Sequence, residues 1–186
     1  MKTSVIFPAR NEEVLIRETV LNVYKYLKKK KYSFEILIVV NGSFDATESI
    51  IKDLNVKYRE ITLLKSKEGY GYALKKGLEK AVGDYIVIYN VDFFDLKLID
   101  LVDVDLLGKD LIVGSKLTFW AEDKRPIKRI VVSRLFNILL KFLFGFKGSD
   151  THGIKIMKKN VVKKVLSKCQ TTSGIFDTEL IIRIQK

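Results

Sequence analysis

The segment DYIVIYNVDFFD, residues 84–95, joins an apolar run to a group of polar side chains. Residues 84–89 are mostly β-branched or aromatic, which is typical of a buried strand. Asn90, Asp92 and Asp95 then follow at the carboxyl end of that strand. Such residues can form a polar turn or cap a helix, but in α/β sheets the same position also holds ligand-binding side chains. The segment alone leaves both interpretations open, and the rest of the chain is needed to choose between them.

Strand and helix patterns alternate on both sides of this segment. Strands are predicted at residues 4–7, 34–40, 61–65, 84–89, 111–115 and 153–157, and helices at 12–30, 45–54, 70–82, 127–144, 160–167 and 177–185. This order predicts an α/β fold with a mainly parallel central sheet and helices on both faces. No linker or internal repeat divides the chain, so we expect one domain over residues 1–186. Its last helix is still amphipathic at Lys186 and is expected to continue beyond it.

The composition is that of a globular protein kept in a reducing compartment. The 186 residues are 47% hydrophobic and 30% charged, which excludes a disordered chain. Cys169 is the only cysteine, so a disulfide framework is impossible within this sequence. His152 is the only histidine, which excludes a metal site built from several histidines.

The charge favours an anionic partner. The sequence has 34 basic and 22 acidic residues, a formal net charge of +12, and such an excess attracts nucleic acid, phospholipid surfaces or phosphorylated substrates. Nucleic acid is disfavoured because no aromatic-rich basic motif accompanies the charge. Residues 127–146 combine apolar residues at helical spacing with lysine and arginine. They predict either an amphipathic helix on an anionic membrane or a helix of the core.

Three further junctions carry polar or glycine-rich sequences. Asn11 is predicted to cap the first helix, and Asp45 the second, after a Gly-Ser turn. Gly69 and Gly71 would let the backbone approach a ligand at the start of the third helix, where phosphate binds well.

In this order, the segments resemble the motifs of family 2 glycosyltransferases with the GT-A (nucleotide-diphospho-sugar transferase) fold. The likeness is greatest to the branch of dolichol-phosphate mannose synthases and polyprenyl-phosphate sugar transferases. It rests on PARNEE (8–13), VVNGSFDAT (39–47), GYGYA (69–73), GDYI (83–86) leading to Asp92, VGSK (113–116), SDTHGIK (149–155) and FDTEL (176–180). The match covers nearly the whole chain.

The resemblance implies inverting transfer of a sugar from a nucleoside-diphosphate sugar to a polyprenyl (dolichyl) phosphate, at the cytoplasmic face of a membrane. It implies a Mg²⁺ or Mn²⁺ ion held by Asp92 and Asn90, which neutralises the leaving diphosphate. Asp92 and Lys116 would be the catalytic residues. Nucleotide-sugar binding would involve Pro8, Arg10, Glu12, Val39, Asn41, Asn90, Val91, Asp92 and Lys116, and acceptor binding Arg134, Asn137 and Asp150.

The chain departs from the family pattern at several of these positions. Asn90 replaces the first acid of the metal pair, Val40 and Asn41 replace an acidic pair, and Arg10 stands where tyrosine is common. These changes leave an alternative, a non-catalytic domain of the same fold that binds sugar nucleotides or lipid phosphates. On the acceptor side, a phosphate needs no general base, whereas a hydroxyl acceptor would require one, from Asp150 or Asp177.

Overall fold

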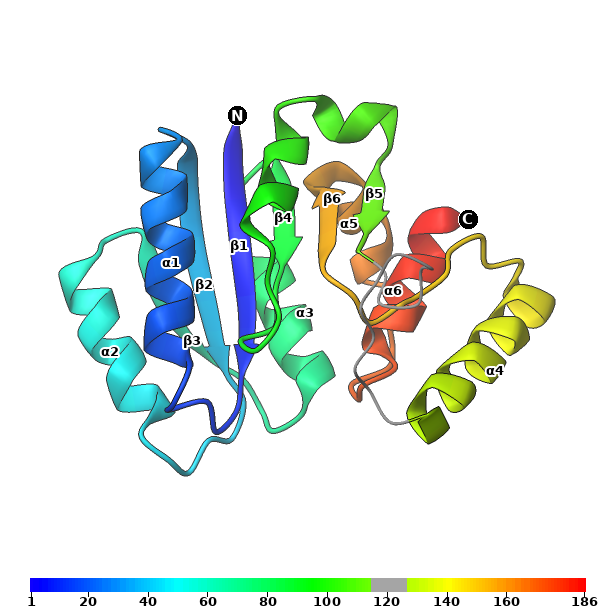
Figure 1. Cartoon of the computed structure of the whole chain (residues 1–186), viewed down its shortest axis with the longest axis horizontal. Helices are drawn as coiled ribbons and strands as arrows, with labels where there is room; N and C mark the ends of the chain where they lie inside the picture. Colours follow the sequence, from blue (N-terminus) through cyan, green and yellow to red (C-terminus); the bar gives the residue numbers. More distant parts are fainter. Residues whose placement is uncertain (115–126) are drawn as a thin grey trace.

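The computed structural model describes residues 1–114 and 127–186, which form an α/β fold around one central sheet (Figure 1). The sheet has six strands in the order β3-β2-β1-β4-β6-β5. The strands are β1 (Lys2–Ala9), β2 (Ser33–Val40), β3 (Ile61–Lys65), β4 (Tyr85–Ile88), β5 (Leu111–Val113) and β6 (Lys155–Lys158). The helices are α1 (Ile16–Lys29), α2 (Thr47–Lys57), α3 (Tyr70–Lys80), α4 (Ile127–Phe144), α5 (Lys159–Leu166) and α6 (Phe176–Gln185), with two 3₁₀ helices, η1 (Leu96–Val102) and η2 (Asp105–Gly108).

The sheet is mainly parallel, as the alternating pattern predicts. β1 pairs in parallel with β2 and β4, and β2 with β3. β6 runs antiparallel to both of its neighbours, β4 and β5. Strands covered on both faces are apolar throughout, and accordingly all four residues of β4 are buried.

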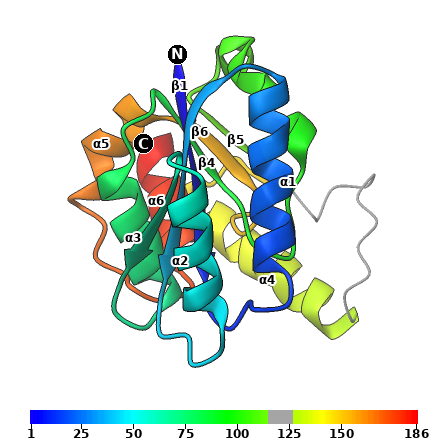
Figure 2. The same cartoon turned by 90° about the vertical axis from the view of Figure 1, so that its left-hand side faces the viewer.

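Helices cover both faces of the sheet and create two separate apolar cores (Figure 2). Alternate side chains of β1 point to opposite faces. Val5 and Phe7 belong to the core under α1, α2 and η1. Ile6 belongs to the core under α3, α5 and α6.

Helix α4 lies at the margin of the fold, beyond α6 (Figure 1). Leu140 is buried together with Phe146 and Ile181 of α6. Most of the other apolar side chains of α4 are exposed, namely Val131, Val132, Leu135, Ile138, Leu139, Phe142, Leu143 and Phe144. Within the described ranges, 1–114 and 127–186, no helix has the length and apolar character needed to cross a bilayer.

The structure corrects the prediction for the start of the first helix. α1 begins at Ile16 rather than residue 12, because the backbone N–H groups of Leu15 and Ile16 both bond to the Glu12 carbonyl and close a separate turn. Asn11 has a positive φ of 56° and does not cap α1. Its side chain accepts a hydrogen bond from Phe44 N instead.

Two other elements differ from the sequence prediction. No helix is predicted from the sequence at η1 or η2, but the cap interpretation of residues 90–95 holds for Asp95, whose carboxylate accepts from Lys97 N at 2.9 Å at the start of η1. Asp45 is predicted to cap α2, but the N-cap residue is Ala46; Asp45 precedes it, and its carboxylate accepts from Thr47 N at 3.0 Å. The remaining predicted elements are present, with ends that move by a few residues; Ser115, predicted as the end of a strand, lies outside the described residues.

Candidate active site

The ends of three parallel strands bring distant polar segments to one edge of the sheet, which we call the carboxyl edge. Pro8 and Ala9 of β1 pair with Val39 and Val40 of β2. On the other side of β1, Ile6 pairs with the last residue of β4, and Tyr89 N donates to Ile6 O at 3.1 Å. Residues 8–12, 39–47 and 90–92 therefore meet at this edge, at the bottom of Figure 1.

The segment that opened the sequence analysis forms a tight turn at the carboxyl edge. Phe93 N donates to Asn90 O at 3.3 Å, which closes the turn around residues 91 and 92. Val91 is 2% exposed, and its carbonyl accepts from the Thr19 hydroxyl of α1 at 2.9 Å. Asp92 is exposed. The turn therefore anchors Val91 in the core and leaves the Asp92 side chain at the surface. The polar-turn interpretation is confirmed, and ligand binding by Asp92 stays a prediction.

Two loops at this edge are held together by reciprocal hydrogen bonds. Asn11 N donates to Ser43 Oγ at 3.1 Å, and Glu12 N donates to Thr47 Oγ1 at 2.7 Å. In the other direction, Glu13 accepts from Ala46 N at 2.9 Å. The β1–α1 and β2–α2 loops are thus held together by hydrogen bonds in both directions.

Three segments bring carboxylates to this edge of a basic protein: Glu12 and Glu13, Asp45, and Asp92. Burial raises the pKa of Glu12 above its ordinary value, and the negative charges of Asp92 and Asp45 raise it further. Among the described residues, no group of three or more acidic, histidine or cysteine side chains could hold a metal alone. The arrangement suits a divalent cation only if a ligand supplies further oxygen atoms.

Two residues predicted to bind the nucleotide already have protein partners. The Arg10 guanidinium lies 2.6 Å from the Glu68 carboxylate. Asn41 is buried, and its backbone N–H and side-chain Nδ2 both donate to Ala9 O, each at 3.1 Å. Asn41 therefore stabilises the end of β1, and its role toward a ligand stays a prediction. Lys116 lies outside the described residues.

The residues predicted for the acceptor are separated into exposed and buried members. Arg134 is exposed on α4, while Asn137 is 8% exposed and donates through Nδ2 to Ser133 O at 3.1 Å. Asp150 is also 8% exposed and accepts from His152 N at 3.0 Å, the bond of an Asx turn. The geometry thus leaves Arg134 as the accessible member of this predicted set.

A buried ionic network lies beneath the acceptor segment, as we call residues 149–155. Lys155 Nζ is 2.8 Å from Asp177 Oδ2, and the two side chains are 1% and 0% exposed. The Tyr70 hydroxyl donates to the same carboxylate oxygen at 3.0 Å. Burial raises the pKa of Tyr70 well above its ordinary value, and the Asp177 charge adds to the effect. Asp177 is thus engaged and inaccessible, which contradicts its prediction as a candidate base.

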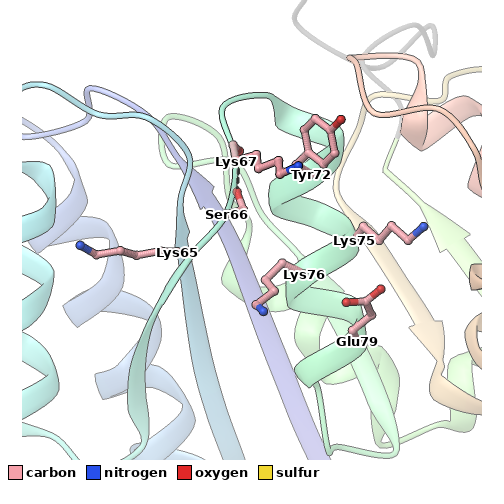
Figure 3. Close-up of a pocket in the computed structure, with 7 residues that line it drawn as sticks. All are labelled: Lys65, Ser66, Lys67, Tyr72, Lys75, Lys76 and Glu79. Carbon is pink, nitrogen blue, oxygen red and sulfur yellow. Dashed lines mark hydrogen bonds between the residues drawn. The ribbon is translucent and has the colours of Figure 1, made fainter.

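A basic hollow of about 580 Å³ lies between β3 and α3, with lysines 65, 67, 75 and 76 on its walls (Figure 3). Their ammonium groups point in different directions, and Lys65 forms an ion pair with Glu48 at 2.7 Å. The hollow is a solvated basic surface that accounts for part of the net charge.

The family follows from comparison with known proteins. A family model described as Glycosyl transferase family 2 matches residues 4–166. The chain belongs to this family.

Two relatives of known name are similar to this chain over nearly its whole length, and the name of the first indicates the branch of the family. A dolichyl-phosphate beta-glucosyltransferase of Dictyostelium discoideum is 27% identical over 98% of this chain and 62% of its own length. Glycosyltransferase AglD of Haloferax volcanii is 29% identical over 100% of this chain and 31% of its own length. The chain thus spans less than two thirds of either relative, within the polyprenyl-phosphate sugar transferase branch that the sequence motifs predict.

Solved structures confirm the predicted fold. Glucosyl-3-phosphoglycerate synthase of Mycobacterium tuberculosis, in complex with uridine diphosphate, has a TM-score of 0.63 at 20% identity, covering 87% of this chain and 58% of that one. TarS residues 1–349 of S. aureus have a TM-score of 0.66 at 17% identity, covering 99% and 55%. The fold is GT-A, the α/β class inferred from the sequence.

Proposed function

We propose that this domain transfers a hexose from a nucleoside-diphosphate sugar to a polyprenyl phosphate, with inversion at the anomeric carbon. The observation that carries the proposal is the turn at residues 90–93, which presents an exposed Asp92 at the carboxyl edge, where β1 and β2 also end. Ligands of open α/β sheets bind at this edge. The name of the Dictyostelium relative, a dolichyl-phosphate beta-glucosyltransferase, supports glucose as the first sugar to test and a polyprenyl phosphate as the acceptor.

On the donor side, Asp92 would be the main protein ligand of a Mg²⁺ or Mn²⁺ ion, with the side-chain oxygen of Asn90 as a weaker one. The donor diphosphate would supply the other oxygens, because one carboxylate and one amide suffice only for a shared site. When bound, the ion would neutralise the charge that develops on the departing nucleoside diphosphate. One solved relative, the mycobacterial synthase, is described in complex with Mn²⁺, UDP-glucose and phosphoglyceric acid.

The acceptor would react without a general base. A phosphate oxygen is already ionised and would form the new bond to the anomeric carbon, while the sugar–diphosphate bond breaks and its electron pair leaves with the nucleoside diphosphate. This agrees with the burial and ion pairing of Asp177, which make it unsuitable to remove a proton. Arg134 would attract the acceptor phosphate, Asp150 would shape the acceptor segment, and Lys116 would share the charge of the leaving group.

Helix α4 would contact the polyprenyl chain at a membrane surface. This helix exposes a row of large apolar side chains, and Arg134 and Lys141 lie among them in its sequence. Basic amphipathic helices lie in the interface of anionic membranes. We therefore propose a peripheral position at the cytoplasmic face of a membrane.

The alternative is a domain that binds sugar nucleotides or lipid phosphates without transferring sugar. The neutral Asn90 favours it, because a single carboxylate holds a hard cation more weakly than two. Mn²⁺ titration of the wild type, with and without UDP, GDP and their sugars, tests both. We expect poor Mn²⁺ binding alone and clear binding with the correct diphosphate.

Variants then distinguish a metal-binding role of Asp92 from a purely structural role in the turn. Asp92→Asn is expected to abolish nucleotide-dependent Mn²⁺ binding and sugar transfer, and Asn90→Asp to strengthen the binding. Asp110→Asn is the matched control, because this exposed acid precedes β5 at the opposite edge of the sheet. If Asp92→Asn binds Mn²⁺ as well as the wild type in the presence of nucleotide, Asp92 is only a turn residue. Normal binding by the wild type without any transfer would support the non-catalytic alternative.

A further inference from the structure

The buried network of Tyr70, Lys155 and Asp177 connects three elements that border different parts of the site. Tyr70 is the first residue of α3, which starts at the glycine-rich turn, and Asp177 lies in the first turn of α6. Lys155 is on β6 and pairs with Ile88 on one side and Val113 on the other. Ile88 is two residues before Asn90. Lys155 therefore lies on the strand between β4, which leads to the turn at residues 90–93, and β5.

The acceptor segment is attached to the start of α6 by further hydrogen bonds. The Thr151 and Thr178 hydroxyls are 2.9 Å apart. His152 Nε2 donates to Gly174 O at 3.2 Å, which leaves its Nδ1 to accept from the Thr151 hydroxyl at 3.0 Å. The acceptor segment is therefore tied by hydrogen bonds to α6 and to the residue two positions before it.

The start of α3 is in equally close contact with the chain just before α6. A Cβ added to Gly71 would lie 2.5 Å from the backbone carbon of Thr172. Glu179 holds the same segment by accepting from Thr171 N at 2.8 Å and from Gln170 N at 3.0 Å. The contact thus joins two backbones with no flexible side chain between them.

The network is not what stability alone would favour. Asp177 Oδ1 is buried and has no hydrogen-bond partner among the described residues. Replacing a buried ion pair by apolar residues of similar volume is often neutral or stabilising, and an unsatisfied buried oxygen is unfavourable. Stability alone therefore gives no reason for the charged pair, which leaves a role in geometry to be tested.

We infer that Asp177 is a positioning residue: through Lys155 and Tyr70 it fixes the acceptor segment relative to the start of α3, and so sets the spacing between the acceptor and donor sides. The inference rests on the proposed function, because the spacing matters only if two ligands react. Misplacing reacting groups by about 1 Å can lower a rate about 100-fold. The network acts on kcat, since each side still binds its own ligand.

Two variants test the inference. Tyr70→Phe removes only the hydroxyl, and Lys155→Met/Asp177→Leu removes the pair without leaving a charge unpaired. We expect kcat to fall about 10- to 100-fold in both, with each KM within about threefold of the wild type. Tyr26→Phe is the matched control, because it removes a tyrosine hydroxyl that bonds to Asp100 away from the site. A double variant as active as the wild type would overturn the inference.

Hydrogen exchange keeps the test independent of transfer. In the wild type, UDP with Mn²⁺ is expected to slow exchange in the acceptor segment, and in Tyr70→Phe this protection is expected to be lost while UDP binding persists. If the wild type binds neither UDP nor GDP, the proposed function fails. The rate of amide hydrogen exchange without ligand then tests the positioning role of the network. About 10-fold faster exchange of residues 149–155 in Tyr70→Phe supports this role, and an unchanged rate overturns it.

Discussion

Gly153 offers a direct test of the geometry that joins the acceptor segment to the strand before it. A Cβ at this position would lie 1.5 Å from Gly114 O and 2.7 Å from its carbonyl carbon. Because ordinary contact begins near 3.4 Å, one of the two backbones has to move by roughly 2 Å in Gly153→Ala. The movement would break the hydrogen bond from Gly114 N to Ile154 O, which is 2.8 Å long.

The magnitude follows from these two effects. Loss of one backbone hydrogen bond costs about 1 kcal/mol, and overpacking a rigid site costs about 1–3 kcal/mol. Gly153→Ala is therefore expected to lower the free energy of unfolding by about 2–4 kcal/mol and the melting temperature by about 5–15 °C. Differential scanning calorimetry measures the shift directly.

Gly174→Ala is the matched control, since a Cβ there would meet nothing within 4 Å. Its free energy of unfolding should stay within about 0.5 kcal/mol of the wild type. A Gly153→Ala protein that melts within about 2 °C of the wild type would refute the close approach of the two glycines. It would also remove the steric reason for glycine in this motif.

Two further predictions concern acid stability and membrane binding. Burial opposes ionisation of Glu179, but hydrogen bonds from Thr171 and Gln170 and from Arg183 lower its pKa to about 2; the stability that this carboxylate contributes is therefore present above pH 4.5 and is lost as the pH falls toward 2. Urea unfolding between pH 2 and pH 7 measures this contribution. At pH 7, Glu179→Gln should be about 1–2 kcal/mol less stable than the wild type, and this difference should shrink toward pH 2. A difference that stays constant with pH would contradict the lowered pKa of Glu179. Phe142→Asp, at a side chain 85% exposed on α4, should leave the melting temperature unchanged but weaken binding to phosphatidylcholine–phosphatidylserine vesicles about fivefold or more, whereas Val56→Asp, at a residue 88% exposed on α2, should not. Equal binding by the two variants would argue against α4 as the membrane surface.

Much of the fold could be predicted because local signals and the tertiary structure agree. The strands are continuous apolar runs, and the parallel arrangement follows from their alternation with helices. The prediction for the start of α1 was wrong because the sequence there is ambiguous. Asn11 followed by two glutamates has the composition of a helix cap. In the structure, the polar groups of residues 11–13 bond to the neighbouring β2–α2 loop. A long-range contact therefore replaced the expected local one.

The candidate site could likewise be predicted only where local sequence signals place the residues. Positions at strand ends, such as Asn90 and Asp92, could be placed because parallel strands finish at a common edge. The ionic network could not, since Tyr70 and Asp177 are 107 positions apart and neither has a local partner that signals burial. The one available signal was the presence of each residue within a family-like segment. Only the packing of α3 against α6 reveals that they act together.

The neutral Asn90 has a physical explanation in the charges around it. Hydrogen bonds tie residues 11–13 to the β2–α2 loop, and burial together with the charges of Asp92 and Asp45 already raises the pKa of Glu12. A second carboxylate at position 90 would add repulsion to the ligand-free site, where no cation offsets it. An amide avoids that repulsion and still offers an oxygen to a metal. On the proposed function, the site would therefore gain its cation together with the nucleotide diphosphate, because the diphosphate supplies the charge that the protein lacks.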